Sequence, residues 1–281
     1  MSFEKIIKSI ETLPPLSDAI IEIQKIYSVG SDNIKILELI KAIESDAILA
    51  VNILKKANSP IYGFSKKISS ISQAVTLFGI RQIRSFIMSY AIENSIKVDM
   101  KVYGITNDRF NDMCNLQSAL VIQWFSKIDL GTVNFIAPLA LIMESGKLIL
   151  ANEILNSNYK DEFIVGLKEC EDISEYEYIL FDINSYELSS VLFSYWHLDS
   201  IYVNVLTEKT ENIDETLLLY KNILKVVNTA INVKGLLTKK SVLKACRIVK
   251  EMNLDVEHFV KACVRTKGIY TKDLKKKSLM R

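Results

Sequence analysis

Apolar residues recur at three- and four-residue spacing along most of the chain, which places them on one face of an α-helix. The clearest example follows Asp46, whose carboxylate can accept hydrogen bonds from the first free amides of a helix. It ends at Asn58-Ser59-Pro60, because proline cannot continue a helix, and Gly63 then permits a turn with positive φ. The stripe consists of Ala47, Ala50, Val51, Leu54 and Ala57.

Two further helices are predicted directly after this turn. The first begins at the Ser69-Ser70 pair, either of which can cap it, and ends at Gly79, a favourable residue for a helix C-terminus. The next covers residues 80–92 and buries an apolar face. We expect Arg81 and Arg84 to lie on its opposite face and to reach solvent. Three helices should therefore meet at sharp corners.

Similar stripes, separated by turn residues, predict helices over most of the remaining chain. They cover residues 3–13, 17–27, 36–43, 109–127, 135–154 with a break at 144–147, 160–170, 174–182, 186–195, a stretch from 214, and two short helices after Gly235. Residues 30–33 are expected to form a turn and cap, and residues 96–108 a connector. Asp129-Leu130-Gly131 is expected to close the helix before it.

Composition supports an all-α globular protein with a sizeable core. Of the 281 residues, 49% are hydrophobic and 24% charged, with only nine glycines and four prolines. We divide the chain into an N-terminal helical subdomain (1–95), a second helical half (96–210) and a C-terminal helical extension (211–281).

Several functional classes are disfavoured by simple features. The sequence contains no run of eighteen apolar residues, so no membrane-spanning helix is predicted. The start MSFEKIIKSIE lacks the apolar core of a secretory signal, so we expect a cytoplasmic protein. The cysteines are widely spaced without a CxxC pair, so neither a zinc site nor a disulfide framework is predicted. They are Cys114, Cys170, Cys246 and Cys263.

Charge is unevenly distributed. Residues 211–281 hold sixteen Lys or Arg against seven Asp or Glu, although the formal net charge of the chain is only +2. This basic tail, which ends in Lys275-Lys276-Lys277, could meet nucleic acid, an anionic membrane surface or an acidic partner, or could form a solvated helical face. The sequence leaves these open.

The N-terminal pattern resembles the HDOD domain family, non-catalytic relatives of the HD-type metal phosphohydrolases found in bacterial signalling proteins. The resemblance is specific over residues 13–90, weaker to about residue 208, and absent in the tail. It implies an HD-domain-like bundle of helices, extended here by the C-terminal helices. The motifs that carry it are Leu13-Pro14-Pro15-Leu16, Asp46-Ala47, Lys55-Lys56-Ala57-Asn58-Ser59, Tyr62-Gly63, Ile68-Ser69-Ser70-Ile71, Gln73-Ala74 and Leu77-Phe78-Gly79-Ile80-Arg81.

This chain departs from the family at the positions that correspond to metal ligands in active HD enzymes. Where a His-Asp pair often precedes glycine and lysine, it has Met143 and Glu144; another histidine position falls at about Ser185, and a third at Asn115, beside Cys114. Metal phosphohydrolases need several imidazoles and a carboxylate to hold their ions. The resemblance therefore implies a lost metal site, no cofactor and no enzymatic activity.

The function that follows from this resemblance is regulatory. We expect a bacterial signal-transduction module that binds an unidentified signalling protein, in a setting such as motility or cyclic-dinucleotide pathways. Polar turn residues on rigid helices commonly carry recognition, so Asn58, Ser59 and Tyr62 are candidate interaction residues, together with Arg81 and Arg84. Asn58 and Ser59 could instead satisfy free carbonyls at the helix end.

Two alternatives stay open. The helix-Gly79-helix unit imitates a helix-turn-helix, so Arg81, Arg84 and the basic tail could contact nucleic acid, although this helix offers few polar side chains to bases. Alternatively, the degenerate cleft could hold a small molecule such as a nucleotide, with Lys147 contacting its phosphate; a salt bridge between Lys147 and Glu144 is the competing role. This cleft would be lined by Asn115, Met143, Glu144, Lys147 and Ser185.

Overall fold

The computed structural model describes residues 3–279 except 15, 31–32, 65 and 208–213, and it is helical almost throughout. The N-terminal part contains α1 (Phe3–Glu11), α2 (Asp18–Ser28), α3 (Ile36–Glu44), α4 (Ala47–Ala57), the 3₁₀ turn η2 (Pro60–Tyr62) and α5 (Ile71–Ser95). The central part contains η3 (Met100–Tyr103), α6 (Asn107–Phe125), α7 (Leu130–Ile142), α8 (Gly146–Leu155), α9 (Lys160–Glu169), α10 (Ile173–Phe181), α11 (Ser185–Tyr195) and α12 (Ser200–Leu206). The C-terminal part contains α13 (Glu215–Ala230), the strands β1 (Ile231–Asn232) and β2 (Gly235–Leu236), α14 (Lys239–Glu251) and α15 (Val256–Leu279).

Local signals in the N-terminal part act as the sequence predicts. Asp46 accepts hydrogen bonds from the amides of Ile48 and Leu49, and Ser70 caps α5 by accepting from Gln73. Gly79 interrupts α5 with φ 75° and ψ 163°, a conformation essentially reserved for glycine, so the two predicted helices meet at this residue. An all-α fold is confirmed.

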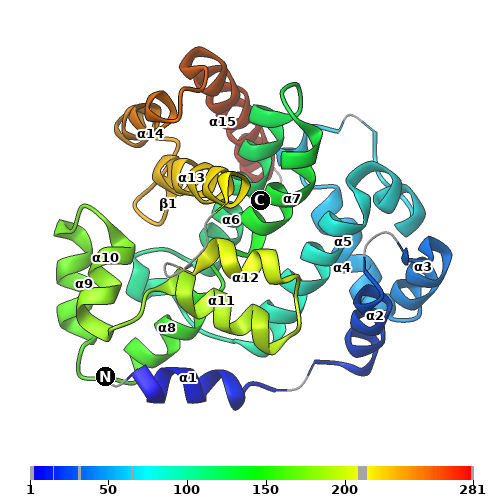
Figure 1. Cartoon of the computed structure of the whole chain (residues 1–281), viewed down its shortest axis with the longest axis horizontal. Coiled ribbons are helices and arrows are strands. Elements are labelled where there is room, and N and C mark those ends of the chain that lie inside the picture. The colour runs from blue at the N-terminus through cyan, green and yellow to red at the C-terminus, as the bar shows by residue number, and fades with distance from the viewer. Residues whose placement is uncertain (1–2, 15, 31–32, 65, 208–213, 280–281) are drawn as a thin grey trace.

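The centre of the molecule is formed by α6 and α7, with α5 packed across α7 (Figure 1). Leu130–Leu155, which contains α7 and α8, is long and apolar enough to span a membrane by length and composition. Yet 83% of its most apolar window is buried inside the chain. Its hydrophobicity therefore serves the protein core, where Ile136, Leu139 and Leu150 are almost fully covered.

Three local predictions are corrected. Asp129 begins α7 rather than closing α6, because its carboxylate accepts from the amides of Gly131 and Thr132. The segment before α14 forms a two-stranded antiparallel hairpin that pairs Ile231 with Leu236. The last helix, α15, is long rather than short. At the predicted cap in 30–33, residues 31–32 lie outside the described residues, and α3 begins after Lys35 without a side-chain cap.

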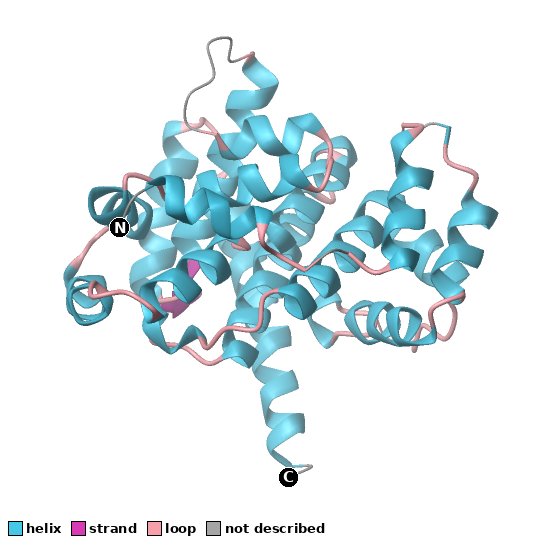
Figure 2. Cartoon of the chain, turned by 90° about the horizontal axis from the view of Figure 1, so that it is seen from below, coloured by secondary structure: helices cyan, strands magenta, loops and turns pink. Residues whose placement is uncertain are grey.

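The two ends of the chain pack against its middle. Helix α1 lies against α8 and α11, away from α2 (Figure 1). Helix α15 packs on α6 and η2, and its far end projects from the body of the molecule (Figure 2). Phe259 of α15 places its ring 4.7 Å from that of Trp124, and His258 Nε2 lies 2.8 Å from the Trp124 carbonyl oxygen. The extension thus contributes to the common core.

Candidate functional site

A buried charged cluster occupies the region where the sequence pattern places the degenerate metal ligands. At its centre, Lys147 of α8 places Nζ 2.8 Å from Glu144 Oε2 and 3.7 Å from Glu177 Oε1. The same ammonium donates a 2.7 Å hydrogen bond to Ser185 Oγ. Glu144, Lys147, Glu177 and Ser185 are at most 1% exposed. One cation and two carboxylates are therefore enclosed together.

Close packing of α8 against α11 brings this cluster together. Gly146 donates its amide hydrogen to Ser189 Oγ at 2.7 Å. A Cβ atom at Gly146 would lie 1.9 Å from the Ser185 backbone oxygen, so any other residue would push the helices apart. The glycine before Lys147 thus permits the approach that places the lysine beside Ser185.

Both carboxylates are also held by neutral donors. Glu177 Oε1 accepts from the Tyr103 hydroxyl at 2.8 Å, and Glu177 Oε2 accepts from the Ser185 amide at 2.7 Å. Glu144 Oε1 accepts from Gln117 Nε2 at 2.8 Å and from the Tyr186 hydroxyl at 3.2 Å. Because most of the acceptor capacity is used internally, the cluster is a closed network.

Electrostatics keep the lysine charged. Burial disfavours its ammonium, but the charges of Glu144 and Glu177 outweigh this and raise the pKa of Lys147 above its ordinary value. Burial, reinforced by the nearby carboxylates, also raises the pKa of the Tyr103 and Tyr186 hydroxyls well above the ordinary value. At neutral pH the cluster therefore holds an ammonium ion and two hydroxyl donors. The predicted salt bridge between Lys147 and Glu144 is confirmed.

These residues do not fit a divalent metal ion. Met143 is fully buried, and Asn115 lies apart from the cluster, within 3.5 Å of the Tyr62 hydroxyl and beside a surface groove. Across the described parts of residues 3–279, no three His, Cys, Asp or Glu side chains come together as a candidate metal site. The position beside Glu144 and Ser185 is filled by the Lys147 ammonium, which would repel a metal ion.

The expected ligand cleft is corrected accordingly. Glu144, Lys147 and Ser185 come together, but they are covered on all sides, whereas Asn115 faces outward. The five predicted residues therefore do not line one open cavity. Lys147 contacts carboxylates and a hydroxyl of its own chain, so its ammonium is not presented to a phosphate.

Sequence reasoning missed Glu177, Tyr103 and Gln117 as members of the cluster. Glu177 carried one usable signal, because it lies four residues from both Ile173 and Phe181, which share its buried face of α10. A carboxylate within an apolar stripe needs a buried partner. Tyr103 and Gln117 belong to other elements and offered no comparable pattern.

The exposure expected for Arg84 is corrected, whereas Arg81 is half-buried. Arg84 is only 7% exposed and binds Asp199 Oδ1 at 3.1 Å, Gln24 Oε1 at 3.0 Å and the His197 carbonyl at 3.0 Å. The Arg81 guanidinium lies 3.9 Å from the centre of the Phe135 ring. Long side chains on this helix are covered by neighbouring helices, so Arg84 is not presented to nucleic acid.

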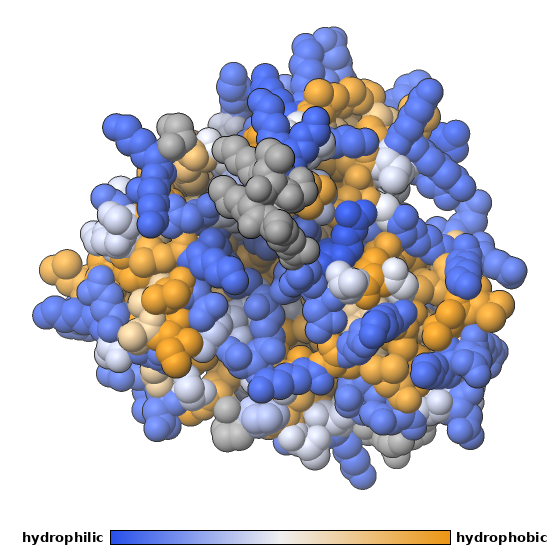
Figure 3. Space-filling model, turned by 180° about the vertical axis from the view of Figure 1, so that it is seen from behind, coloured by the Kyte–Doolittle hydropathy of each residue, from blue (hydrophilic) through white to orange (hydrophobic). Residues whose placement is uncertain are grey.

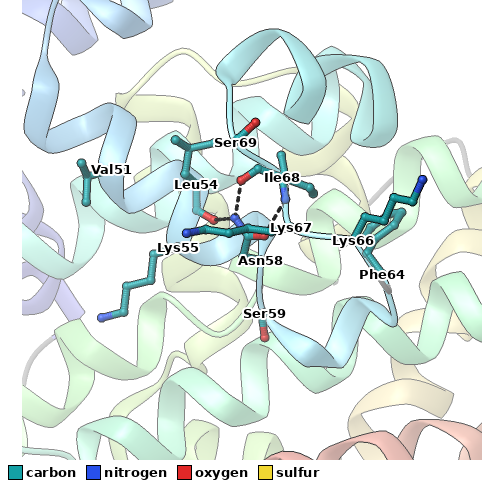
Figure 4. A pocket seen from close by; sticks show the side chains of 10 residues that line it. All are labelled: Val51, Leu54, Lys55, Asn58, Ser59, Phe64, Lys66, Lys67, Ile68 and Ser69. Carbon is teal, nitrogen blue, oxygen red and sulfur yellow. Dashed lines mark hydrogen bonds between the residues drawn. The ribbon is translucent and has the colours of Figure 1, made fainter.

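The other candidate interaction residues divide into buried and surface positions. Tyr62 is 7% exposed and packs edge-to-face on Phe78 at 5.0 Å. Asn58 donates to the carbonyls of Leu54 and Ile68 and accepts from the Ile68 amide. It therefore has the helix-end role that was the alternative to recognition. Asn58 and Ser59 nevertheless line a surface groove between α4 and residues 64 and 66–69 (Figure 4).

Comparison with known proteins places this arrangement in a family. The HDOD domain model matches residues 13–212. The chain belongs to the HDOD domain family. The match ends before α13, so the C-terminal helices lie beyond the family domain.

Individual relatives of this HDOD protein are distant in sequence. An uncharacterized protein of Treponema pallidum (strain Nichols) is 23% identical over 205 residues, which make up 70% of this chain and 37% of that protein. This chain thus spans well under half the length of that relative.

Solved structures share the fold at low sequence identity. A candidate phosphohydrolase of Shewanella amazonensis SB2B has a TM-score of 0.67 at 14% identity, covering 94% of each chain. A candidate signal transduction protein of Marinobacter aquaeolei VT8 has a TM-score of 0.66 at 19% identity, covering 97% of this chain and 60% of the other. The HD-like fold predicted from the sequence is confirmed.

Proposed function

We propose that this HDOD protein is a non-catalytic regulatory module of bacterial signal transduction, which acts by binding a partner protein. The observation that carries the proposal is the Lys147 ammonium, 2.8 Å from Glu144 and enclosed with Glu177 and Ser185. An HD phosphohydrolase needs a metal ion and a path for substrate to this region. Here a side-chain cation neutralises the carboxylate and solvent is excluded.

Electrostatics support the absence of hydrolysis. A metal ion near Glu144 would have to displace an ammonium held by two carboxylates and a hydroxyl. Removing one member of a buried charge pair costs about 3–5 kcal/mol. Metal binding would therefore have to offset this cost without the several imidazoles used by HD enzymes.

Family membership supports a regulatory role. The HDOD model covers the part of the chain that contains both the buried cluster and the surface groove. One solved relative with the same fold is described as a candidate signal transduction protein. A protein that catalyses no reaction can act in signalling only by binding other molecules, so its surface determines what it does.

Metal content and activity test this proposal together. The full chain, purified without chelators and incubated with manganese, iron or magnesium ions, should retain no stoichiometric metal by mass spectrometry. It should also leave bis(p-nitrophenyl) phosphate intact. Stoichiometric metal, or hydrolysis that Glu144→Ala abolishes, would show that the protein is an enzyme. Glu153→Ala, a variant of α8 outside the cluster, is the matched control. Hydrolysis that is lost in Glu144→Ala but kept in Glu153→Ala belongs to this protein, whereas hydrolysis that persists in both variants comes from a contaminant.

A further inference from the structure

A groove beside Asn58 has a composition suited to binding a protein segment. It has a volume of about 620 Å³. Val51 and Leu54 supply apolar surface from α4, and the largely buried Ile68 lies at the opposite wall, in the segment that precedes α5 (Figure 4). The remaining lining residues are Lys55, Asn58, Ser59, Phe64, Lys66, Lys67 and Ser69.

Charge in this groove has one sign. Lys55, Lys66 and Lys67 are exposed, and the described lining residues include no Asp or Glu. The adjoining groove on the other side of Ser59 differs, because Glu93, Asp108 and Asp112 accompany its lysines. An uncompensated group of lysines favours an anionic partner and attracts it over a distance of about 8–10 Å at physiological salt.

Apolar side chains are exposed around the same lysines. Val51 is 64% exposed and Phe64 is 43% exposed, and Ile48, one turn before Val51 on the same face of α4, is 66% exposed. Figure 3, which views the molecule from behind, shows apolar patches interspersed with hydrophilic surface on its left, the side where α2 to α4 lie. Apolar groups gathered beside a groove and bordered by charge are typical of protein docking surfaces.

The groove is held in shape before any partner binds. Asn58 connects α4 to the opposite wall through hydrogen bonds of 2.7 Å and 2.8 Å with the Ile68 backbone. The Phe64 ring packs against Phe78 with its centre 5.2 Å away, in an edge-to-face arrangement. A preformed surface loses little conformational freedom on binding, which favours affinity.

We propose that this groove binds a segment of a partner protein in which Asp or Glu residues flank an apolar side chain. The apolar side chain would lie over Leu54 beside Val51 and Phe64, and the acidic residues would meet Lys55, Lys66 and Lys67. The proposal rests on the proposed regulatory function and specifies the surface through which it operates. Exposed aliphatic residues on the same face as the lysines, Val51 and Ile48, favour a peptide over the uniform negative backbone of a nucleic acid.

Selection from a displayed random library of peptides of about twelve residues tests the proposal. Peptides are selected on the full chain and counter-selected on the Lys66→Glu/Lys67→Glu variant. Enriched peptides should carry Asp or Glu beside Leu, Ile or Phe. By fluorescence polarisation, their Kd should rise about tenfold or more in that variant and should weaken with added salt.

Two further variants separate the groove from a general charge effect. Lys127→Glu/Lys160→Glu changes exposed lysines elsewhere by the same charge and should leave the peptide Kd within about twofold. Val51→Asn should raise it about fivefold, since the apolar contact is lost. Circular dichroism of each variant establishes that the fold is retained.

Three results would overturn the docking proposal. They are a selection that enriches no acidic-apolar peptide, an equal Kd in the groove and control variants, and binding of a labelled oligothymidine that depends on the lysines but not on Val51. None of these results depends on metal content or phosphodiesterase activity. A failed docking site and a failed regulatory function are therefore distinguishable.

Discussion

The Lys147 ammonium lies 2.8 Å from Glu144 Oε2, and their side chains are 2% and 0% exposed. The residues are three positions apart, but a 3₁₀-like turn between α7 and α8, rather than a continuous helix, brings their charges together. Glu177 adds a second carboxylate from α10. This lysine thus links the charge balance of the buried cluster to the stability of the fold.

Replacing this lysine tests the link. Lys147→Met keeps most of the side-chain volume but leaves two buried carboxylates without their cation. We expect the free energy of unfolding to fall by about 3–5 kcal/mol, measured by urea titration. The triple variant Lys147→Met/Glu144→Gln/Glu177→Gln should recover part of the loss, because it removes the unpaired charges.

The control for this prediction is an exposed ion pair. Lys101 Nζ lies 3.0 Å from Asp99 Oδ2, with side chains 80% and 48% exposed. Lys101→Met should change the free energy of unfolding by at most about 1 kcal/mol. Equal effects of Lys147→Met and Lys101→Met would contradict a special role for burial.

Stability should fall in alkaline solution. Burial raises the pKa of the Tyr103 hydroxyl well above that of an unfolded tyrosine, about 10, so the unfolded chain releases this proton first as pH rises. Despite burial, Glu144 and Glu177 raise the pKa of Lys147. Its contribution is complete below the unfolded pKa, about 10.4, and is lost as pH rises through the folded pKa. Both effects lower stability above about pH 10.

Urea titrations between about pH 8 and 11 measure this slope. Tyr103→Phe should lower the free energy of unfolding at every pH, because Glu177 loses a donor, yet should make its alkaline decline shallower. Tyr178, which is 44% exposed, provides the control. An unchanged slope in Tyr103→Phe, or the same flattening in Tyr178→Phe, would refute the assignment.

Arg84 should be important for stability. Arg84→Ala removes the ion pair with Asp199 and the hydrogen bonds to Gln24 and the His197 carbonyl. We expect a loss of about 2–4 kcal/mol in the free energy of unfolding. Arg247→Ala, at an exposed position of α14, should change it by less than about 0.5 kcal/mol. If Arg84→Ala and Arg247→Ala lowered the free energy of unfolding by similarly small amounts, the contacts of Arg84 with α2 and the start of α12 would not contribute to stability.

The C-terminal extension should unfold together with the family domain. Phe259→Ala creates a cavity beside Trp124 and should cost about 3–5 kcal/mol, with one urea transition seen by both circular dichroism and tryptophan fluorescence. Leu243→Ala, at a side chain 56% exposed, is the control. Two separate transitions in the wild-type chain would contradict a shared core.

Local features of the fold were predictable because they depend on residues close in sequence. Asp46 and Ser70 cap helices through amides two or three positions ahead, and the positive φ of Gly79 breaks α5 into two helices. The role of Asp129 was misjudged, since an aspartate two residues before a glycine suits either a turn or the start of a helix. Asp129 serves the second purpose.

The sequence by itself determined the helical architecture, the family pattern and the loss of histidine ligands, because these follow from periodicity and residue type. Tertiary structure alone decided which cation lies beside Glu144 and which arginine was covered. Ser185 approaches Lys147 through the packing of α11 on α8, and Glu177 does so from α10, which packs beside α11. Asp199 meets Arg84 across more than a hundred residues. Helical periodicity marks an apolar face, but contacts between distant elements decide which charges become enclosed.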